Sequence, residues 1–130
     1  MAIQQLNRYK GETITFRLIG SNGYIFNGEN AEPFIVYVYP DGLDVLDPAN
    51  QSKVTTVDSN IETVSDTIPY IVRIEGKNEV QCVIPYKRTA SENMPAGKYT
   101  MEIRYGGSII SVITRNNAFT LVNAFSAVSI

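Results

Sequence analysis

Histidine is absent from the 130 residues of this chain, and cysteine occurs once, as Cys82. Without histidine, neither a Ser-His-Asp triad nor a Cys-His pair can form, and no metal site can use imidazole ligands. A single cysteine also excludes a disulfide bond within the chain. We therefore expect a protein that is not an enzyme and that carries no cofactor.

The sequence also lacks long apolar runs and clusters of one charge. No run approaches the roughly 20 apolar residues that span a bilayer, and residues 1–10 lack the charged start and apolar stretch of a secretory signal peptide. Lysine and arginine number 11 against 13 acidic residues, for a net charge of -2, and they form no basic stripe. We expect a protein that stays in the cytoplasm where it is made, with no membrane or nucleic-acid partner.

What the sequence does contain is short segments in which apolar and polar residues alternate, separated by Gly, Pro, Asn and Asp. These segments cover residues 12–18, 34–39, 54–57, 70–75, 80–84, 99–105, 108–114 and 119–122. Gly106-Gly107 predicts a tight hairpin that pairs Tyr105 with Ser108. The pattern predicts an all-β fold, with residues 1–130 forming a single antiparallel β-sandwich of about seven strands.

One face of each predicted strand is apolar, and these faces should meet in one shared core. The residues predicted for this core are Ile14, Phe16, Leu18, Val36, Val38, Val72, Ile74, Val80, Ile84, Tyr99, Met101, Ile103, Val112, Phe119 and Leu121. Cys82 shares the inward face of its strand, which indicates a buried structural thiol and not a nucleophile.

Asp41, Asp44 and Asp47 recur at intervals of three, a spacing that invites a calcium interpretation. An EF-hand loop needs a central Gly and a closing Glu, but Leu46 and Ser52 occupy those two positions. We interpret the three carboxylates as solvated turn residues and expect no bound metal.

Most of the eight tyrosines fall in predicted strands, where tyrosine is a good sheet former. Tyr9, Tyr24 and Tyr86 fall in loops or at strand margins, and these are the aromatic side chains that a ligand could use. A carbohydrate- or cell-surface-binding β-sandwich module, with a host-surface glycan as its ligand, is therefore the alternative function.

The segment from Pro95 to Ile103 places Gly97 two residues before Tyr99, and Met101 two residues after it. This arrangement resembles the start of strand F in immunoglobulin-like domains, where the Tyr hydroxyl bonds back to the backbone at a corner. The resemblance implies an immunoglobulin-like sandwich in which Met101 stands where antibody domains carry a disulfide cysteine.

That segment and three further motifs occur in a characteristic order within residues 10–123. They are Gly11-Glu12-Thr13, Pro40-Asp41-Gly42, Ala96-Gly97-Lys98-Tyr99 and Phe119-Thr120-Leu121-Val122. This order resembles the N-terminal immunoglobulin-like domain of phage baseplate upper proteins and related virion modules of tailed phages. The resemblance implies a virion structural protein that is assembled in the host cytoplasm. It would serve as a tail, baseplate or head-fibre attachment or decoration module, with other virion proteins as partners.

The two possible docking tails are residues 1–9 and 124–130. The stretch of residues 2–6 in the first tail is partly apolar and uncharged, and the second tail is apolar and uncharged throughout. Such β-prone tails favour strand addition to a neighbouring subunit in a homo-oligomer or particle. The residues expected to make these contacts are Ile3, Leu6, Phe125, Val128 and Ile130. The alternative is that the C-terminal tail adds a strand to its own sheet.

Overall fold

The computed structural model describes residues 4–5, 13–21, 23–85, 98–106, 111–120 and 127–129, with the backbone alone described for 4–5, 111, 113–120 and 127–129. Within these ranges the chain is mostly β-strand, and the one helical element is the short 3₁₀ helix η1 (Pro48–Lys53). The all-β prediction is confirmed. None of the helical structure in these ranges is long and apolar enough to cross a membrane.

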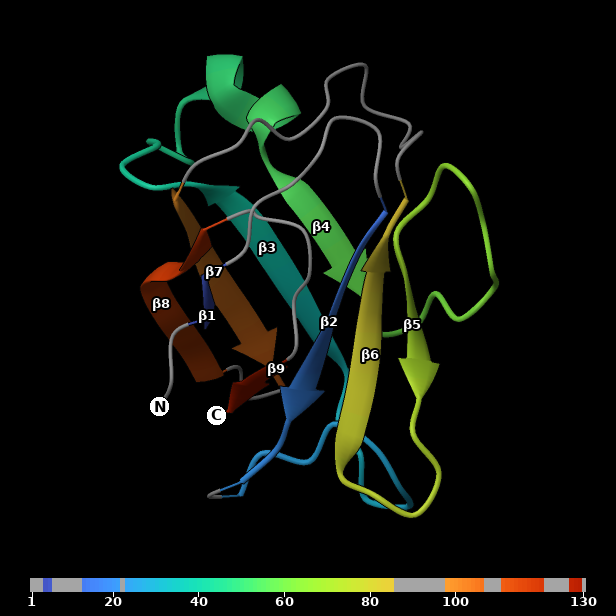
Figure 1. Ribbon diagram of the computed structural model, residues 1–130. Coiled ribbons are helices and arrows are strands. Elements are labelled where there is room, and N and C mark those ends of the chain that lie inside the picture. Colours follow the sequence, from blue (N-terminus) through green and yellow to red (C-terminus); the bar gives the residue numbers. More distant parts are fainter. Residues whose placement is uncertain are drawn as a thin grey trace.

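The strands form a five-stranded sheet of order β1-β8-β7-β3-β4 and a four-stranded sheet of order β5-β6-β2-β9 (Figure 1). Neighbouring strands are antiparallel except for β1 with β8 and β9 with β2, which are parallel. The bounds are β1 Gln4–Gln5, β2 Ile14–Ile19, β3 Phe34–Pro40, β4 Thr55–Asp58, β5 Tyr70–Arg73, β6 Glu79–Ile84, β7 Lys98–Tyr105, β8 Ser111–Thr120 and β9 Ala127–Ser129.

Alternating side chains direct one face of each sheet into a shared core. In β2, Phe16 and Leu18 are buried while Arg17 between them is exposed. Strand β3 lies between β7 and β4, and its outward-facing Ile35 and Tyr37 are half-buried. Residues of both sheets belong to one hydrophobic cluster, so the two sheets pack face to face like the layers of a sandwich.

Most of the predicted core residues that the structure describes are buried. They are Ile14, Phe16, Leu18, Val36, Val38, Val80, Ile84, Tyr99, Met101 and Ile103. The side chain of Phe119 and the whole of Leu121 lie outside the described residues.

Three residues that were predicted for the core are not buried in it. Val72 is 38% exposed, Val112 is 55% exposed, and Ile74 is half-buried beyond the end of β5. In β5, Ile71 pairs with Cys82 and is fully buried, so Val72 faces outward. The alternation of Val72 and Ile74 with Arg73 and Glu75 indicated the opposite face. It was misleading because Arg73 shares the face of Ile71, at the end of β5, where Glu62 and two backbone carbonyls accept its hydrogen bonds.

The predictions for the C-terminal strands were also wrong in two respects. Tyr105 pairs with Ser111 and not with Ser108, so the connection between β7 and β8 is longer than a two-residue hairpin. Residues 115–117, which were predicted to separate two strands, lie inside the continuous strand β8. The register shifts between Tyr99 and Met101 of β7, and this irregularity accommodates the extra residues of β8.

A loop residue, Phe26, completes one end of the core. Its side chain is fully buried and packs edge-to-face on Phe34 and Tyr105, with ring centroids 5.0 and 5.7 Å away. The hydroxyl of Tyr105 accepts a hydrogen bond from the Ile25 N–H (2.8 Å) and donates to the Ile25 carbonyl (3.3 Å). The loop between β2 and β3 is therefore anchored to β7 by aromatic packing and by hydrogen bonds.

Asn78 fixes the same loop to the turn between β5 and β6. Its side chain accepts a hydrogen bond from the Phe26 N–H and donates one to the Tyr24 carbonyl, each at 2.8 Å. A Cβ atom at Gly20 would collide with the Tyr24 carbonyl and with the Asn78 side chain. Glycine at position 20 therefore permits the close approach on which these contacts depend.

Candidate functional site

The outer face of the five-stranded sheet carries a row of polar and aromatic side chains. On β3, Ile35 and Tyr37 are half-buried and alternate with the fully buried Val36. On the neighbouring β7, Glu102 and Arg104 face the same side, since they pair with Tyr37 and Ile35 respectively. The register therefore brings an aromatic ring, a carboxylate and a guanidinium group together on one surface.

Arg104 is held across this surface by two contacts. Its guanidinium carbon lies 4.9 Å from the centre of the Tyr37 ring, and its Nε donates to Glu102 Oε2 at 3.0 Å. The Arg104 side chain is 50% exposed, so neither contact adds much to stability. Their effect is to restrict the orientation of the guanidinium group.

Two hollows lie on this surface, and Tyr37 and Arg104 line both of them. One hollow, of about 240 Å³, is also lined by Pro33, Phe34, Ile35, Asp58, Asn60 and Gly106. The second, of about 170 Å³, is also lined by Tyr39, Val45, Leu46, Gln51 and Glu102. Because they share these two residues, the hollows lie next to each other along β3, and we call them together the groove; Val45 and Leu46, in the loop that leads into η1, line its second hollow.

The hydroxyl of Tyr39, which lines the second hollow, ionises less readily than usual. Burial is the main reason that the pKa of Tyr39 lies above its ordinary value of 10.0, and the charges of Glu102 and Asp41 raise the pKa further. Arg104 acts in the opposite direction. The hydroxyl therefore stays protonated at neutral pH and can donate a hydrogen bond.

Each of the three aspartates considered for calcium accepts a hydrogen bond from the protein, and two of them do so within their own loop. Asp44 Oδ1 accepts from the Leu46 N–H, and Asp47 caps η1 by accepting from the Ala49 N–H, each at 3.0 Å. Asp41 Oδ1 accepts from the Thr100 hydroxyl at 2.6 Å. In the parts of the chain that are described, no group of three or more acidic, cysteine or histidine side chains is arranged to hold a metal ion.

Cys82 lies in the centre of the core, as its position on the inward face of β6 predicted. Its side chain is fully buried, and this burial raises the pKa of the thiol far above its usual value. The thiolate, which is the reactive form of cysteine, is therefore not populated at neutral pH.

The predicted ligand aromatics do not form a group in the described part of the chain. Tyr24 is half-buried, and its ring packs edge-on against Tyr105 with centroids 5.1 Å apart. Tyr9 and Tyr86 lie outside the described residues. The tyrosines that line the hollows are instead Tyr37 and Tyr39, whose places in a predicted strand had indicated sheet formers only.

The predicted docking tails are described only in part. Strand β9 (Ala127–Ser129) pairs in parallel with β2 of the same chain, which is the intrachain alternative. The backbone of Val128 lies in this strand, while Ile3, Leu6, Phe125 and Ile130 lie outside the described residues. The proposed contacts of these tails with a neighbouring subunit stay a prediction.

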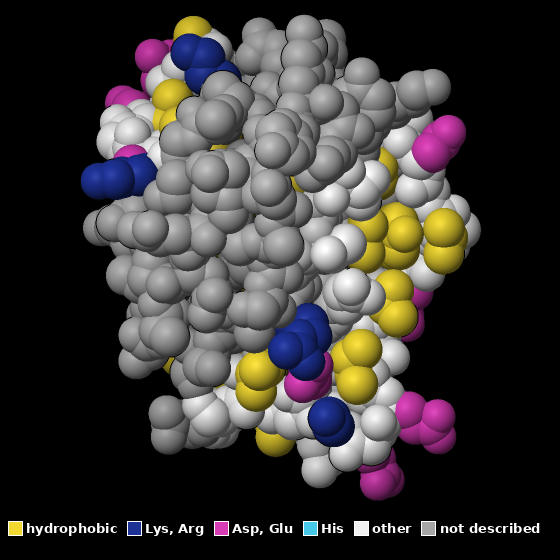
Figure 2. All heavy atoms as spheres, viewed as in Figure 1, with side chains coloured by type: hydrophobic (Ala, Val, Ile, Leu, Met, Phe, Trp, Pro, Cys, Tyr) yellow, Lys and Arg dark blue, Asp and Glu magenta, His cyan; other side chains and the backbone are white. Residues whose placement is uncertain are grey.

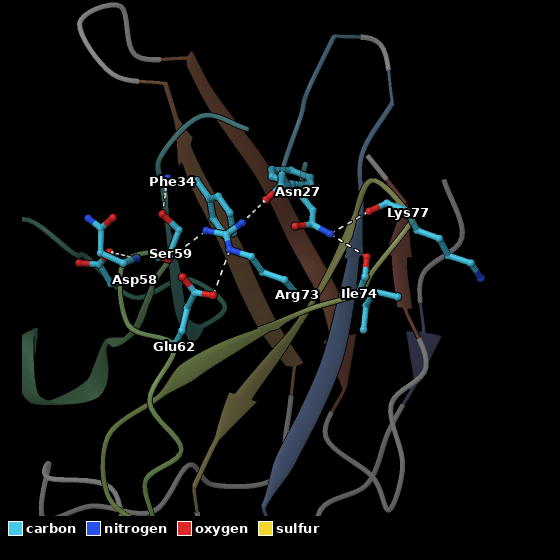
Figure 3. Close-up of polar contacts among 10 residues, drawn as sticks. Asn27, Phe34, Asp58, Ser59, Glu62, Arg73, Ile74 and Lys77 are labelled. Carbon is cyan, nitrogen blue, oxygen red and sulfur yellow. Dashed lines mark hydrogen bonds and ion pairs between the residues drawn. The ribbon is translucent and has the colours of Figure 1, made fainter. Parts of the chain in front are cut away.

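Arg73, on β5, donates a hydrogen bond from each of its three guanidinium nitrogens (Figure 3). Its nitrogens donate to Glu62 Oε1 (3.1 Å), to the Phe26 carbonyl (3.0 Å) and to the Ser59 carbonyl (3.5 Å). These contacts join β5 to the loop that follows β4 and to the loop before β3. Because all three guanidinium nitrogens are used inside the protein, we assign Arg73 a structural role.

The groove was missed because its residues come from three strands and a loop that are distant in sequence. Tyr37 and Tyr39 do alternate with Val36 and Val38, and this period-two aromatic pattern was the one available signal. Comparison with known proteins adds no further assignment: no protein-family model matches this sequence, and no curated protein matches it either.

Proposed function

We propose that this domain is an immunoglobulin-like structural module of a tailed-phage virion and that it acts through contacts with other virion proteins. The fold part of this proposal rests on the strand order. Immunoglobulin domains pair strands A, B, E and D in one sheet and C, F and G in the other, which variable-type domains extend with C′. Here β2-β6-β5 corresponds to B-E-D, and β4-β3-β7-β8 corresponds to C′-C-F-G.

Two details bear on this correspondence. Met101 is fully buried on β7, the counterpart of strand F, and takes the place of a disulfide cysteine. Strand β9 takes the position of strand A beside β2, but it runs parallel to β2 instead of antiparallel. The proposed domain is thus a disulfide-free variant in which the chain's last strand completes the sheet.

The observation that carries the proposed protein–protein role is the apolar outer surface at the β5 edge of the four-stranded sheet. Val72 and the nearby Ile68 are 38% and 43% exposed, and Tyr70 between them in sequence is half-buried. Figure 2 shows hydrophobic side chains gathered over β5 and β6. The outer face of an antiparallel sheet is usually polar, and an apolar patch with a polar rim is typical of protein contacts.

The first test is genomic and biochemical. The genes that flank this one should encode portal, capsid or tail proteins, and mass spectrometry of purified particles should detect the chain. A flanking region without virion genes, or particles without the chain, would show that the virion assignment is wrong.

The second test addresses the apolar patch. Val72→Glu places a charge in the patch and should strongly reduce incorporation of the protein into particles, because a carboxylate would be buried in the contact. Val64→Glu is the matched control, since Val64 is 75% exposed in the loop between β4 and β5 and should tolerate the same change. Equal incorporation of the two folded variants would exclude this surface as the contact.

The C-terminal strand is a separate element of the same proposal. A chain truncated after Asn123 lacks β9 and its pairing with β2. If the tail joins neighbouring subunits, the truncated protein should show a lower mass by light scattering and should fail to enter particles. Unchanged mass and incorporation would leave β9 with an intrachain role alone.

A further inference from the structure

The groove on the outer face of the five-stranded sheet has the geometry of a small-ligand site, and this inference is independent of the proposed virion contacts. Ile35 of β3 pairs with Asp58 on one side and with Arg104 on the other. The three residues therefore lie side by side across three strands, which spans about 10 Å at the usual spacing of strands. An apolar floor thus separates a carboxylate wall from a guanidinium wall.

Four polar side chains of the groove, those of Asp58, Gln51, Arg104 and Glu102, each use one polar atom inside the protein. Asp58 Oδ1 accepts from the Asn60 N–H (2.8 Å), Gln51 Nε2 donates to the Val45 carbonyl (3.0 Å), and Arg104 Nε donates to Glu102 Oε2 (3.0 Å). These bonds restrict the orientation of the side chains before any ligand binds.

The remaining polar atoms of the same side chains have no such partner. Among the described residues, no hydrogen bond engages Asp58 Oδ2, Gln51 Oε1, Glu102 Oε1 or the two Nη atoms of Arg104. Acceptors therefore outnumber the one cationic donor, and they stand beside the apolar surfaces of Ile35 and Tyr37. A ligand that fits must offer several donors, an apolar face and no negative charge.

We propose that this groove binds a neutral saccharide of at least two sugar units, one in each hollow. The hydroxyl groups of such a ligand would donate to Asp58, Gln51 and Glu102, and they would accept from Arg104. The less polar faces of the sugar rings would pack on Ile35 and on the exposed parts of Tyr37. Tyr37 and Arg104, which line both hollows, form the boundary between the two subsites.

The groove suits an extended peptide less well. Strand addition needs free backbone groups, but the backbones of β3 and β7 beneath the groove are already paired with each other, and β3 also pairs with β4. An acidic sugar is disfavoured because Asp58 and Glu102 together exceed the charge of Arg104. Binding of a basic peptide or of an acidic sugar alone is therefore an outcome that would contradict the proposal.

The test is a titration of the ¹⁵N-labelled full chain, followed by NMR, with maltotriose, cellotriose, mannotriose and diacetylchitobiose. At least one of these neutral probes should give saturable shifts at residues 35–37, 58–60 and 104, with a dissociation constant of about 1 mM or less, typical of a weak and specific site. Absence of saturable shifts with all four probes up to about ten times that concentration would overturn the proposal.

Two variants locate the binding. Tyr37→Ala removes the side chain shared by both hollows, and Asp58→Asn removes the carboxylate charge while it keeps an acceptor for the Asn60 N–H. Each should weaken the binding at least tenfold. Tyr70→Ala is the matched control, because Tyr70 is a half-buried tyrosine on the other sheet, and its affinity should equal that of the wild type. Unchanged binding of the neutral probes to both groove variants would refute the assignment. Binding of sialyllactose or of an oligolysine peptide, without binding of any neutral probe, would refute it as well.

Discussion

The hydroxyl of Tyr105 offers a direct test of how the loop between β2 and β3 is held. Tyr105→Phe keeps the ring and its edge-to-face contacts with Tyr24 and Phe26, at 5.1 and 5.7 Å, and removes only the oxygen. That oxygen makes two hydrogen bonds with the backbone of Ile25, at 2.8 and 3.3 Å. Each such bond contributes about 1 kcal/mol. Because water can reach the half-buried Ile25 and replace part of this contribution, we expect the free energy of unfolding to fall by about 1.5 kcal/mol.

Urea unfolding followed by circular dichroism measures this loss. The midpoint should fall while the slope m stays constant, and the melting temperature should fall by about 5 °C for a domain of this size. Tyr70→Phe is the control, because no hydrogen bond of the Tyr70 hydroxyl is present among the described residues, and it should change stability by less than about 0.5 kcal/mol. An unchanged midpoint for Tyr105→Phe, or an equal loss for both variants, would refute the anchoring role of this hydroxyl.

Four further predictions follow from the core and the groove. Met101→Asp places an unpaired charge at a fully buried position and should cost several kcal/mol, so a folded variant with unchanged melting would contradict the placement of β7 in the core. Tyr99→Phe should lower stability by about 1 kcal/mol, the scale of one buried hydrogen bond. A change below about 0.3 kcal/mol would show that the Tyr99 hydroxyl does not hold the corner at the start of β7. Because burial raises the pKa of the Cys82 thiol, a thiol reagent at pH 8 should label the protein only after urea unfolds it; rapid labelling of the folded protein would contradict this. Because the folded pKa of Tyr39 lies above its unfolded value near 10.0, its contribution to stability is complete below pH 10 and is lost as the pH rises through the folded pKa. Tyr39→Phe should therefore reduce the alkaline loss of stability in urea titrations, and an identical pH profile would count against this.

Alternation along the chain was sufficient to predict the all-β class and most of the inward-facing residues. In β2 and β7 the polar residues mark the outer face unambiguously, since Arg17 and Arg104 alternate with the buried Leu18 and Ile103. A charged side chain in the middle of a strand is costly to bury, so in these two strands it marks the solvated face.

Alternation failed where a charged side chain lies at the end of a strand on its inward face, as Arg73 does in β5, or where pairing is irregular. The inward face of β5 was decided by the pairing of Ile71 with Cys82 and not by the sequence of β5 itself. The continuity of β8 through residues 115–117 depends on the register shift opposite Tyr99 and Met101 of β7. In both places a partner strand supplied the information that the local pattern lacked.

The sequence by itself therefore determined the fold class, the buried Cys82 and the turn role of Asp44 and Asp47, because local alternation and short-range hydrogen bonds govern these features. The tertiary structure alone decided the groove. Asp58, Tyr37 and Arg104 belong to three strands, and only the registers of β4 and β7 against β3 bring their side chains together. Strand register is set by packing over the whole sheet, so a site that spans several strands cannot be located from the residues of any one of them.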